Sequence, residues 1–297
     1  MIDGIIIKAL SGFYYVASEK GIVECKARGR FRLDGSSPLV GDRVSCSLDA
    51  NGKGRVDVVK ERKNWFIRPA VANIDALVFV AANTNPVTDP FLVDRISVIA
   101  AEAGCEMILC INKTDIDPGD DLFRIFSGAG FPVVRTSAET GEGMEELLRL
   151  LQGKVSAFTG NSGVGKSSIL NVLLPEARIR TGEVSEKLGR GRHTTRHVEL
   201  YMICSDTYIA DTPGFASLDV TMTNTILKEN LQYDFIDFAP YLGKCRFHDC
   251  AHLKEPDCAV TNAVAKGEIS QSRYRSYARL YELSAQHKFW EYREETR

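Results

Sequence analysis

The sequence predicts a multidomain α/β protein in three parts: a small all-β N-terminal domain, a P-loop domain and a mainly helical, metal-binding C-terminal domain. Three observations support this division. Short alternating runs fill the first part, strands alternate with helices from about residue 74, and a Cys/His cluster follows residue 225. We therefore expect domains at residues 1–67, 68–224 and 225–297.

The first part consists of short apolar or alternating runs. Polar turns rich in Ser, Gly, Asp and Asn separate these runs, and helical periodicity is absent. Such spacing favours a small barrel or sandwich. The expected strands are Ile5–Leu10, Gly12–Ser18, Ile22–Ala27 and Asp42–Ser47.

The middle part has a different pattern. Ile74–Ala81 is a continuous apolar run of the kind found in buried parallel strands. Apolar residues then recur at helical spacing from Leu92 to Ala103, and Gly104 suits the position that follows a helix. Because further strands and helices alternate up to Thr159, we expect a parallel sheet with helices on both faces.

The formal net charge of −2 is distributed unevenly. Residues 1–68 hold 13 Lys and Arg against 8 Asp and Glu, a net of +5, whereas residues 69–225 hold 13 against 20, a net of −7. A polyanion is therefore expected to contact mainly the first part. No apolar run approaches the roughly 18 residues of a membrane span, and no signal peptide is recognised, so we expect a cytoplasmic protein with no membrane contact.

A glycine-rich motif follows the expected strand Val155–Thr159. Glycines allow a tight turn whose N–H groups point at phosphate oxygens, the lysine reaches the β- and γ-phosphates, and the serine hydroxyl binds Mg²⁺. A chance glycine-rich turn is the alternative, but the preceding strand and the helix expected from Ser168 favour a P-loop. The motif G-x-x-x-x-G-K-[ST] comprises Gly160, Asn161, Ser162, Gly163, Val164, Gly165, Lys166 and Ser167.

The motif N-K-x-D stands at the end of another expected strand. A carboxylate there accepts two hydrogen bonds from guanine, whereas adenine offers no such donor pair, so Asp115 should select GTP over ATP. Ser137 and Ala138 resemble the loop whose backbone donates to the guanine carbonyl. The motif residues are Asn112, Lys113, Thr114 and Asp115.

A D-x-x-G motif ends the nucleotide-binding set. Asp211 should hold Mg²⁺ through water, and the N–H of Gly214 should contact the γ-phosphate. An ordinary Asp-Pro-Gly turn is the alternative. A threonine from the preceding Gly- and Arg-rich segment should complete the Mg²⁺ shell, and both Thr194 and Thr195 remain open for this role.

Phe215 stands where Ras-like enzymes carry a glutamine that orients the attacking water. Phenylalanine cannot hydrogen-bond to water, so unaided hydrolysis should be slow and a partner or another residue should accelerate it. His193 is the nearest polar candidate for the catalytic group. It could equally be a solvent-facing loop residue, with the partner supplying that group.

Three cysteines and one histidine lie within fourteen positions, at Cys245, Cys250, His252 and Cys258. Because three thiolates and an imidazole form a common tetrahedral Zn²⁺ site, one Zn²⁺ per chain is expected. Four unrelated residues are the alternative, since the spacing is not the common C-x₂-C pattern. The other cysteines, expected to be reduced and mostly in the core, are Cys25, Cys46, Cys105, Cys110 and Cys204.

Basic residues near aromatic rings suggest three RNA-binding surfaces. The first is an alternating row that would lie on one face of a strand, where an ordinary solvated face is the alternative. The second adds a stacking ring. The third lies on a C-terminal helix that its tyrosines could equally pack into the core. They are Lys26, Arg28, Arg30 and Arg32; Lys60, Arg62, Lys63 and Trp65; and Arg273, Tyr274, Arg275, Tyr277 and Arg279.

The motifs run in an unusual order, because N-K-x-D precedes the P-loop and D-x-x-G comes last. In this order, and with Gly41-Asp42-Arg43-Val44 and the Cys/His cluster, the chain resembles the ribosome small-subunit-dependent GTPase A family. The resemblance implies an N-terminal OB-fold, a circularly permuted Ras-like GTPase domain and a zinc domain. It also implies a role for His193 as the switch histidine that substitutes for the missing glutamine.

The resemblance further implies a partner and an activity. Such proteins bind the small ribosomal subunit and its rRNA, act in late subunit maturation, and hydrolyse GTP to GDP with stimulation by the subunit. We expect a monomer. Two other classes are alternatives: a general P-loop ATPase, which Asp115 disfavours, and a non-catalytic RNA-binding module with GTP as a structural ligand, which Phe215 leaves open.

Overall fold

The computed structural model describes most of the chain, which divides into two units. Of Asp211 only the backbone is described. One unit comprises Met1–Ala76, Leu148–Phe158 and Leu170–Phe215, and the other comprises Leu77–Leu147, Thr159–Ile169 and Ala216–Arg297. The described residues are 1–29, 31, 37–49, 52–67, 69–175, 198–211 and 226–285.

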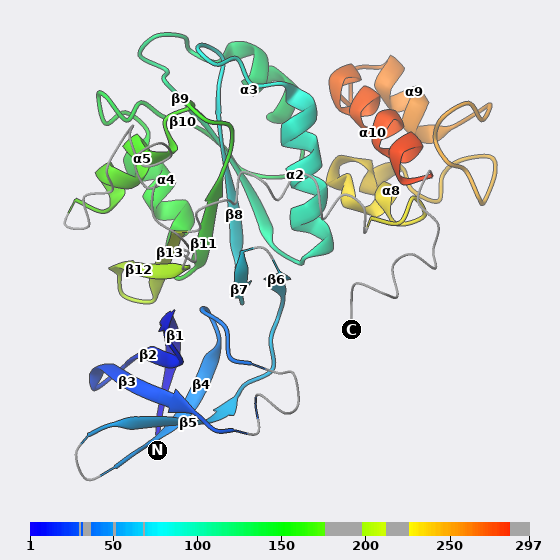
Figure 1. Ribbon diagram of the computed structural model, residues 1–297. Coiled ribbons are helices and arrows are strands. Elements are labelled where there is room, and N and C mark those ends of the chain that lie inside the picture. Colours follow the sequence, from blue (N-terminus) through cyan, green and yellow to red (C-terminus); the bar gives the residue numbers. More distant parts are fainter. Residues whose placement is uncertain are drawn as a thin grey trace, which may run out of the picture. The chain divides into compact units, whose positions relative to one another are not determined.

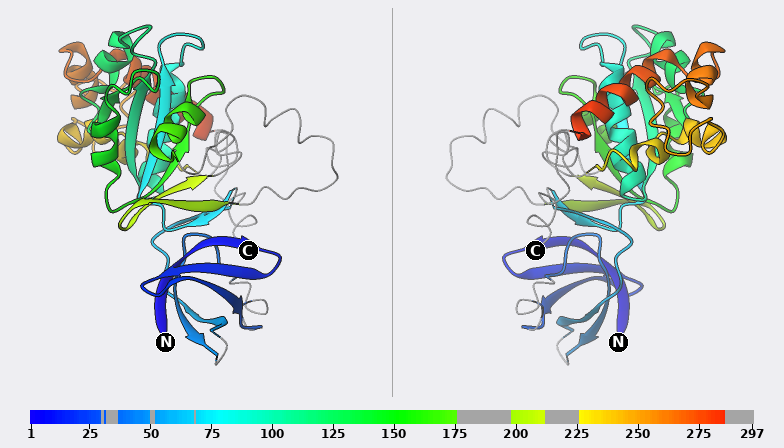
Figure 2. Two further views of the ribbon diagram at one scale, coloured as in Figure 1. Left: turned by 90° about the vertical axis from the view of Figure 1, so that its left-hand side faces the viewer. Right: turned by 90° about the vertical axis from the view of Figure 1, so that its right-hand side faces the viewer.

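Five strands of the first unit close into an OB-like barrel (Figures 1 and 2). The order is β1-β2-β3-β5-β4, and β4 also pairs with β1, which completes the ring. Inward-facing side chains such as Val16, Val44 and Val56 are fully buried. The expected barrel is confirmed. Its strands are β1 (Ile2–Leu10), β2 (Phe13–Ser18), β3 (Gly21–Ala27), β4 (Arg43–Leu48) and β5 (Gly54–Val59).

The rest of the first unit holds a hairpin and three further strands. The hairpin consists of β6 (Trp65–Ile67) and β7 (Ala70–Ala72). Strand β11 runs parallel to β13, as expected, whereas β12 is antiparallel to β13, so the sheet is mixed at β12. The reason is local, because only Ser205 and Asp206 join these two strands, and so short a connection produces a hairpin. The strands are β11 (Val155–Thr159), β12 (Glu199–Cys204) and β13 (Thr207–Asp211).

In the second unit, buried strands alternate with helices. Nearly every residue of β8 and β9 is buried, as expected of central strands, and β10 pairs with β9 in parallel. Helix α2 begins at Pro90 behind an Asp89 N-cap, and Gly104 follows its end with a φ of 63°. These elements are β8 (Ala76–Ala82), α2 (Pro90–Glu102), β9 (Glu106–Asn112), α3 (Asp120–Phe126), β10 (Val133–Arg135), α4 (Met144–Leu151) and α5 (Lys166–Leu173), the last two shared with the first unit.

The C-terminal part is helical, and its helices α8 and α10 pack against α2 (Figure 1). Phe235, Phe238 and Tyr277 form the centre of this packing, with ring centroids 4.9 to 5.4 Å apart. No helix in the described parts of the chain is long and apolar enough to cross a membrane. The elements are α8 (Leu231–Asp234), η3 (Ile236–Tyr241), α9 (Ala259–Ala265) and α10 (Gln271–Ser284).

Candidate functional site

The P-loop requires glycine at both ends of its motif. Gly160 and Gly165 have φ values of 135° and 97°, which L side chains rarely adopt. A Cβ on Gly160 would lie 2.2 Å from the carbonyl oxygen of Val80, and one on Gly165 would lie 2.2 Å from Nδ2 of Asn112. The second contact shows that the P-loop packs directly against the N-K-x-D loop.

Lys166 begins helix α5 and folds back over its own loop. Its Nζ donates to the carbonyl oxygens of Gly160 and Asn161, the latter at 2.7 Å. Burial lowers the pKa of Lys166. These carbonyl partners are neutral, so an anion of two or more charges placed in the loop would be a stronger partner for this ammonium group.

Asn112 connects the base-reading loop to the P-loop. Its Nδ2 donates to the carbonyl oxygen of Val164 at 2.9 Å, and its Oδ1 accepts from the backbone N–H of Ala138 at 3.2 Å. Oδ1 of Asp115 accepts from the hydroxyl of Ser137 at 2.6 Å. Three segments far apart in sequence therefore meet here, as the motif analysis predicted.

A cavity of about 280 Å³ lies where these segments meet. It combines a carboxylate, backbone groups and the start of a helix, which suits a planar base with a neighbouring phosphate chain. Ser168 and Gly165 line it from the P-loop side. The other lining residues are Asn112, Lys113, Asp115, Ile116, Ala138 and Glu139.

Other predicted members of this site lie outside the described residues, namely His193, Thr194, Thr195 and Gly214. Asp211 ends strand β13, as expected. Ser162 and Gly163 stand in the described loop before α5, and Ser167 stands in the first turn of that helix.

The predicted metal ligands converge. The ligand atoms of Cys245, Cys250, His252 and Cys258 all lie within 4.8 Å of one another. The two sulfurs of Cys245 and Cys258 are 3.8 Å apart, and Nδ1 of His252 is 3.5 and 3.4 Å from them. A tetrahedral zinc with Zn–S bonds of ~2.3 Å has edges of about 3.8 Å, so the four residues fit this ion. Burial lowers the pKa of His252, which favours the neutral form that ligation requires.

Two residues that sequence reasoning missed hold the cluster. Oε1 of Gln232 on α8 lies 3.0 Å from Nε2 of His252, which leaves Nδ1 for a metal. Glu255 accepts from the backbone N–H groups of Ala251, Leu253 and Lys254 at 2.9 to 3.0 Å. Glu255 lies between two of the ligands in the sequence, so its position could have suggested a role in the cluster. Gln232 lies 13 positions before the first ligand, and no local pattern pointed to it.

Comparison with known proteins agrees with this geometry. The family model described as RsgA GTPase matches residues 59–221, and the model described as RsgA N-terminal domain matches residues 3–56. The chain belongs to the RsgA GTPase family. A relative from Caldanaerobacter subterraneus subsp. tengcongensis, named small ribosomal subunit biogenesis GTPase RsgA, is 45% identical over 94% of each chain. The protein of that name from Shouchella clausii is 43% identical over 96% of this chain and 99% of its own.

Solved structures show the same architecture. The crystal structure of YjeQ from Thermotoga maritima matches with a TM-score of 0.83 and 37% identity, over 97% of this chain and 99% of that one. The crystal structure of YloQ, described as a circularly permuted GTPase, matches with a TM-score of 0.81 and 36% identity, over 97% and 96%. The motif order in the sequence therefore agrees with the circularly permuted fold of this solved structure.

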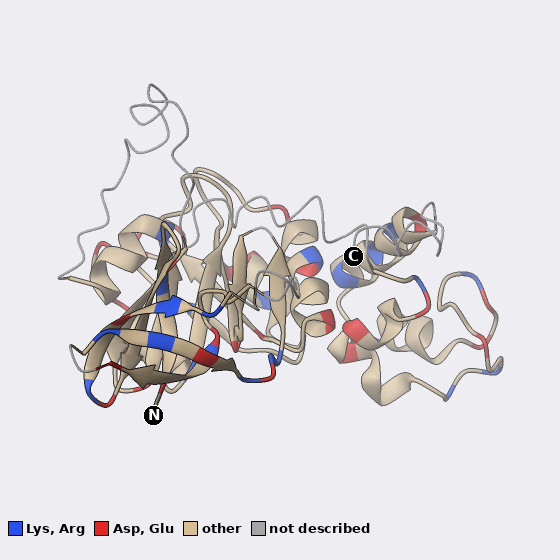
Figure 3. Cartoon of the chain, turned by 60° about the horizontal axis from the view of Figure 1, so that its bottom comes forward, with Lys and Arg blue, Asp and Glu red and all other residues tan. Residues whose placement is uncertain are grey.

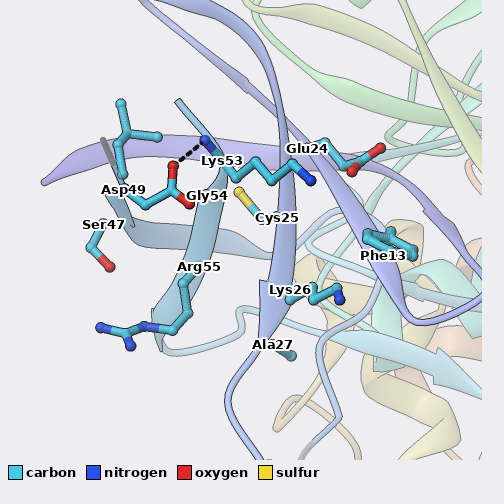
Figure 4. Close-up of a pocket in the computed structure, with 11 residues that line it drawn as sticks. Phe13, Glu24, Cys25, Lys26, Ala27, Ser47, Asp49, Lys53, Gly54 and Arg55 are labelled. Atoms are coloured by element: carbon cyan, nitrogen blue, oxygen red, sulfur yellow. Dashed lines mark hydrogen bonds between the residues drawn. The ribbon is translucent and has the colours of Figure 1, made fainter. Parts of the chain in front are cut away.

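This RsgA family member has a second cavity, of about 610 Å³, at one end of the barrel. Figure 4 shows Phe13 and Lys26 on one side, Asp49 and Arg55 on the other, and the sulfur of Cys25 between them. Nζ of Lys26 lies 4.9 Å from the ring centre of Phe13. The remaining lining residues are Glu24, Ala27, Ser47, Leu48, Lys53 and Gly54.

The basic row expected on one strand is contradicted at Arg28. Strand β3 ends at Ala27, and Arg28 lies beyond it, where it pairs with Asp57 at 2.6 Å. Arg30 and Arg32 lie outside the described residues. Lys and Arg are instead spread over several barrel strands, interspersed with Asp and Glu (Figure 3).

In the second expected RNA surface, the three basic side chains form ion pairs within the chain, whereas the tryptophan is exposed. Trp65 is 58% exposed and available for stacking. Its basic neighbours all form ion pairs: Lys60 with Asp3, Arg62 with Asp42 and Lys63 with Asp75.

The third expected RNA surface, on helix α10, is divided between core and solvent, since Arg275 and Arg279 are exposed and Tyr274 is half-buried. Arg273 and Tyr277 are each 1% exposed, so the packing alternative holds for them. Arg279 stacks on the ring of Phe91 at 3.9 Å. The prediction for Cys204 is wrong, since this residue ends strand β12 and is exposed, not in the core.

Proposed function

We propose that this chain is a GTPase that binds the small ribosomal subunit and acts in its late maturation, hydrolysing GTP to GDP and phosphate with stimulation by the subunit. The observation that carries the proposal is the cavity shared by Asp115, Ala138 and Gly165, because it joins a base-reading carboxylate to a P-loop. Family membership and the names of the relatives support the choice of partner.

The residues divide the work as follows. Asp115 accepts the two N–H donors of guanine, and the N–H of Ala138, which donates to Oδ1 of Asn112 in the free site, would turn to the guanine carbonyl. Lys166 exchanges its loop carbonyls for the β- and γ-phosphates, as the loop N–H groups surround them. Mg²⁺ neutralises phosphate charge when bound; Ser167, Asp211 and one of Thr194 and Thr195 would hold it.

His193 is proposed to orient the attacking water, since Phe215 cannot. We expect His193→Ala to keep GTP-dependent subunit binding and to lose most of the stimulated turnover. A variant with full stimulated turnover would assign the catalytic group to the ribosomal particle. Binding of GDP and non-hydrolysable GTP forms to subunits with equal affinity would remove the proposed nucleotide dependence.

One Zn²⁺ is proposed at Cys245, Cys250, His252 and Cys258, where it supplies folding energy to the C-terminal part. Metal analysis of protein purified without chelators should give close to one zinc per chain. Much less than one zinc would remove this assignment.

The barrel cavity is proposed to hold an unpaired rRNA nucleotide. The ring of Phe13 offers a stacking surface, and Lys26, Lys53 and Arg55 offer cations for phosphates. Lys53→Glu should weaken subunit binding and reduce its salt dependence. The same substitution at Lys20, which does not line the cavity, is the matched control.

We further propose that residues 1–67, 68–224 and 225–297 serve as the barrel, GTPase and zinc domains of a cytoplasmic monomer. The decisive experiment measures GTP turnover with and without purified small subunits, with ATP as a competitor. We expect slow intrinsic turnover, strong stimulation and no competition by ATP. Competition by ATP would favour the ATPase alternative, and absence of turnover in both conditions would favour the non-catalytic RNA-binding module.

A further inference from the structure

Helix α2 begins next to the nucleotide site. The loop between β8 and α2 is closed by Thr88, whose N–H donates to the carbonyl of Ala82 at 2.8 Å and whose hydroxyl accepts from the N–H of Ala82 at 3.0 Å. Asp89 then caps the helix by accepting from the N–H of Phe91 at 3.0 Å. The first turn of α2 and this loop are therefore fixed to each other.

The same loop touches both nucleotide-binding motifs. Nζ of Lys113 donates to the carbonyl of Asn85 at 2.5 Å, and Nδ2 of Asn83 donates to Asp117 at 3.0 Å. On the other side, Pro86 packs so closely on Gly163 that an added Cβ there would lie 3.3 Å from Cδ of the proline. A shift of this loop would move the base-reading loop and the P-loop relative to each other.

Further along α2, a buried ion cluster ties the helix to the C-terminal part. Arg273 of α10 donates to Asp94 of α2 at 2.6 Å, and to both oxygens of Asp237 at 2.6 and 2.8 Å. The side chains of Arg273 and Asp94 are 1% and 0% exposed. Phe126, Phe131 and Phe235 surround the guanidinium group at 5.1 to 5.8 Å. We name Arg273, Asp94 and Asp237 the junction.

Helix α10 in turn holds the cysteine cluster. The hydroxyl of Tyr274 donates to the carbonyl oxygens of His252 and Leu253 at 3.0 and 3.1 Å, and that of Tyr277 donates to Ala251 at 2.8 Å. Both tyrosines follow Arg273 within about one turn of the helix. The helix that carries the junction therefore also fixes the backbone of a metal ligand.

We propose that Arg273 is a positioning residue that couples zinc retention in the C-terminal part to GTP affinity, through α2 and the loop that follows β8. Release of zinc requires the C-terminal part to open locally, and opening separates α10 from α2. Once α2 loses the junction, the loop is less firmly held and the nucleotide motifs bind GTP more weakly. GTP must then disfavour opening by the same factor, because coupling between two binding sites is reciprocal.

The experiment uses the zinc-loaded full chain and rests on the proposed GTP and zinc sites. Transfer of zinc to a coloured chelator is timed with and without a non-hydrolysable GTP analogue, and analogue affinity is measured by fluorescence. We expect the analogue to slow zinc transfer about tenfold. In Arg273→Lys, which keeps the charge but loses the two-pronged contact with Asp237, this effect should fall below threefold.

A second variant protects the test against a simple folding failure. Combining Arg273→Met with Asp94→Asn and Asp237→Asn removes every charge of the junction, so no buried charge is left unpaired. It should bind both ligands and show no coupling. The matched control is Arg246→Met, which breaks an exposed pair with Asp257 beside the cysteine cluster and should keep the full effect.

Different failures are distinguishable. If both ligands bind and neither affects the other, this inference is wrong while the proposed function stands. Full coupling in Arg273→Lys and in the neutral triple variant would also overturn it. If the protein binds no GTP or no zinc, the proposed function fails together with this inference.

Discussion

Lys166 is a half-buried cation and Arg273 a fully buried one, and their surroundings differ. Lys166 donates to two carbonyl oxygens of its own loop, and burial lowers its pKa. Burial alone would also lower the pKa of Arg273, but hydrogen bonds to Asp237 and the charge of Asp94 raise it. One cation is left with weak neutral partners, whereas the other is neutralised by its own chain.

This difference separates a ligand site from a structural one. Neutral carbonyl partners are replaced at little cost by a phosphate, so Lys166 is ready for an anion. Arg273 already pairs with two carboxylates at 2.6 Å, so it is not available to an anionic ligand. It instead holds α10 on α2. Substitution of each cation should therefore change a different quantity.

The largest expected effect is on stability at the junction. Arg273→Met leaves Asp94 and Asp237 buried without a partner and should lower the free energy of unfolding by about 3–5 kcal/mol. Urea denaturation measures this. The exposed control Arg246→Met should cost less than about 1 kcal/mol. Equal losses of unfolding free energy in Arg273→Met and Arg246→Met would show that the buried junction is not a special source of stability.

Lys166→Met should show the reverse pattern. Loss of the phosphate-binding cation should lower subunit-stimulated turnover by about 100- to 1,000-fold. Stability should stay level or rise slightly, because a desolvated charge is removed. A large fall in the urea midpoint would mean that Lys166 is also structural, against the assignment made here.

These two cations also show what the sequence could predict. Lys166 belongs to a motif whose residues are adjacent in the chain, so the sequence alone predicts that it binds phosphate. The partner Asp94 lies 179 positions from Arg273, and the Arg-Tyr alternation of α10 fitted an RNA surface as well as a core. Pairing over such distances depends on tertiary packing, which a local pattern does not contain.

The barrel gives a second example. Four of its strands were expected, but β5, which carries the charged residues Arg55 and Asp57, was not. In the structure Arg55 donates to Asp57 at 3.1 Å, and Arg28 pairs with the same carboxylate. Mutual pairing makes these charges tolerable in a barrel strand, and that pairing is visible only after folding.

Two carboxylates, Asp115 and Asp234, show the same difference between a ligand site and a structural site, with smaller expected effects. Asp115 has one hydroxyl partner in Ser137 and should pair with two donors of guanine. Asp115→Asn should weaken GTP binding about 10- to 100-fold, because the amide offers a single acceptor oxygen. Nucleotide affinity measured by fluorescence tests this, with Glu145→Gln, an exposed residue of α4 that does not line the cavity, as control. Unchanged GTP affinity would remove Asp115 from base recognition.

Asp234 is a carboxylate of the structural kind, and the smallest expected effect concerns its titration. It lies on α8 and is 7% exposed, and Glu102 of α2 is its neighbour. Burial, followed by the charge of Glu102, raises its pKa to about 7. Burial likewise raises the pKa of Asp94 to about 7, although Arg273 opposes the shift.

The sign of the pH dependence follows from these raised values. A carboxyl whose pKa is higher in the folded state contributes stability that is complete below its unfolded pKa, near 3.8, and is lost as pH rises through about 7. The free energy of unfolding of the zinc-loaded protein, measured by urea denaturation, should therefore fall between pH 5 and pH 7 and level off above pH 7, by at most about 1.4 kcal/mol per pH unit for each group. In Asp234→Asn the amide keeps a hydrogen bond to Glu102 without titrating, so only the Asp94 contribution remains and the slope should be about half. An unchanged slope in this variant would place the titration elsewhere and would remove Asp234 from the structural class.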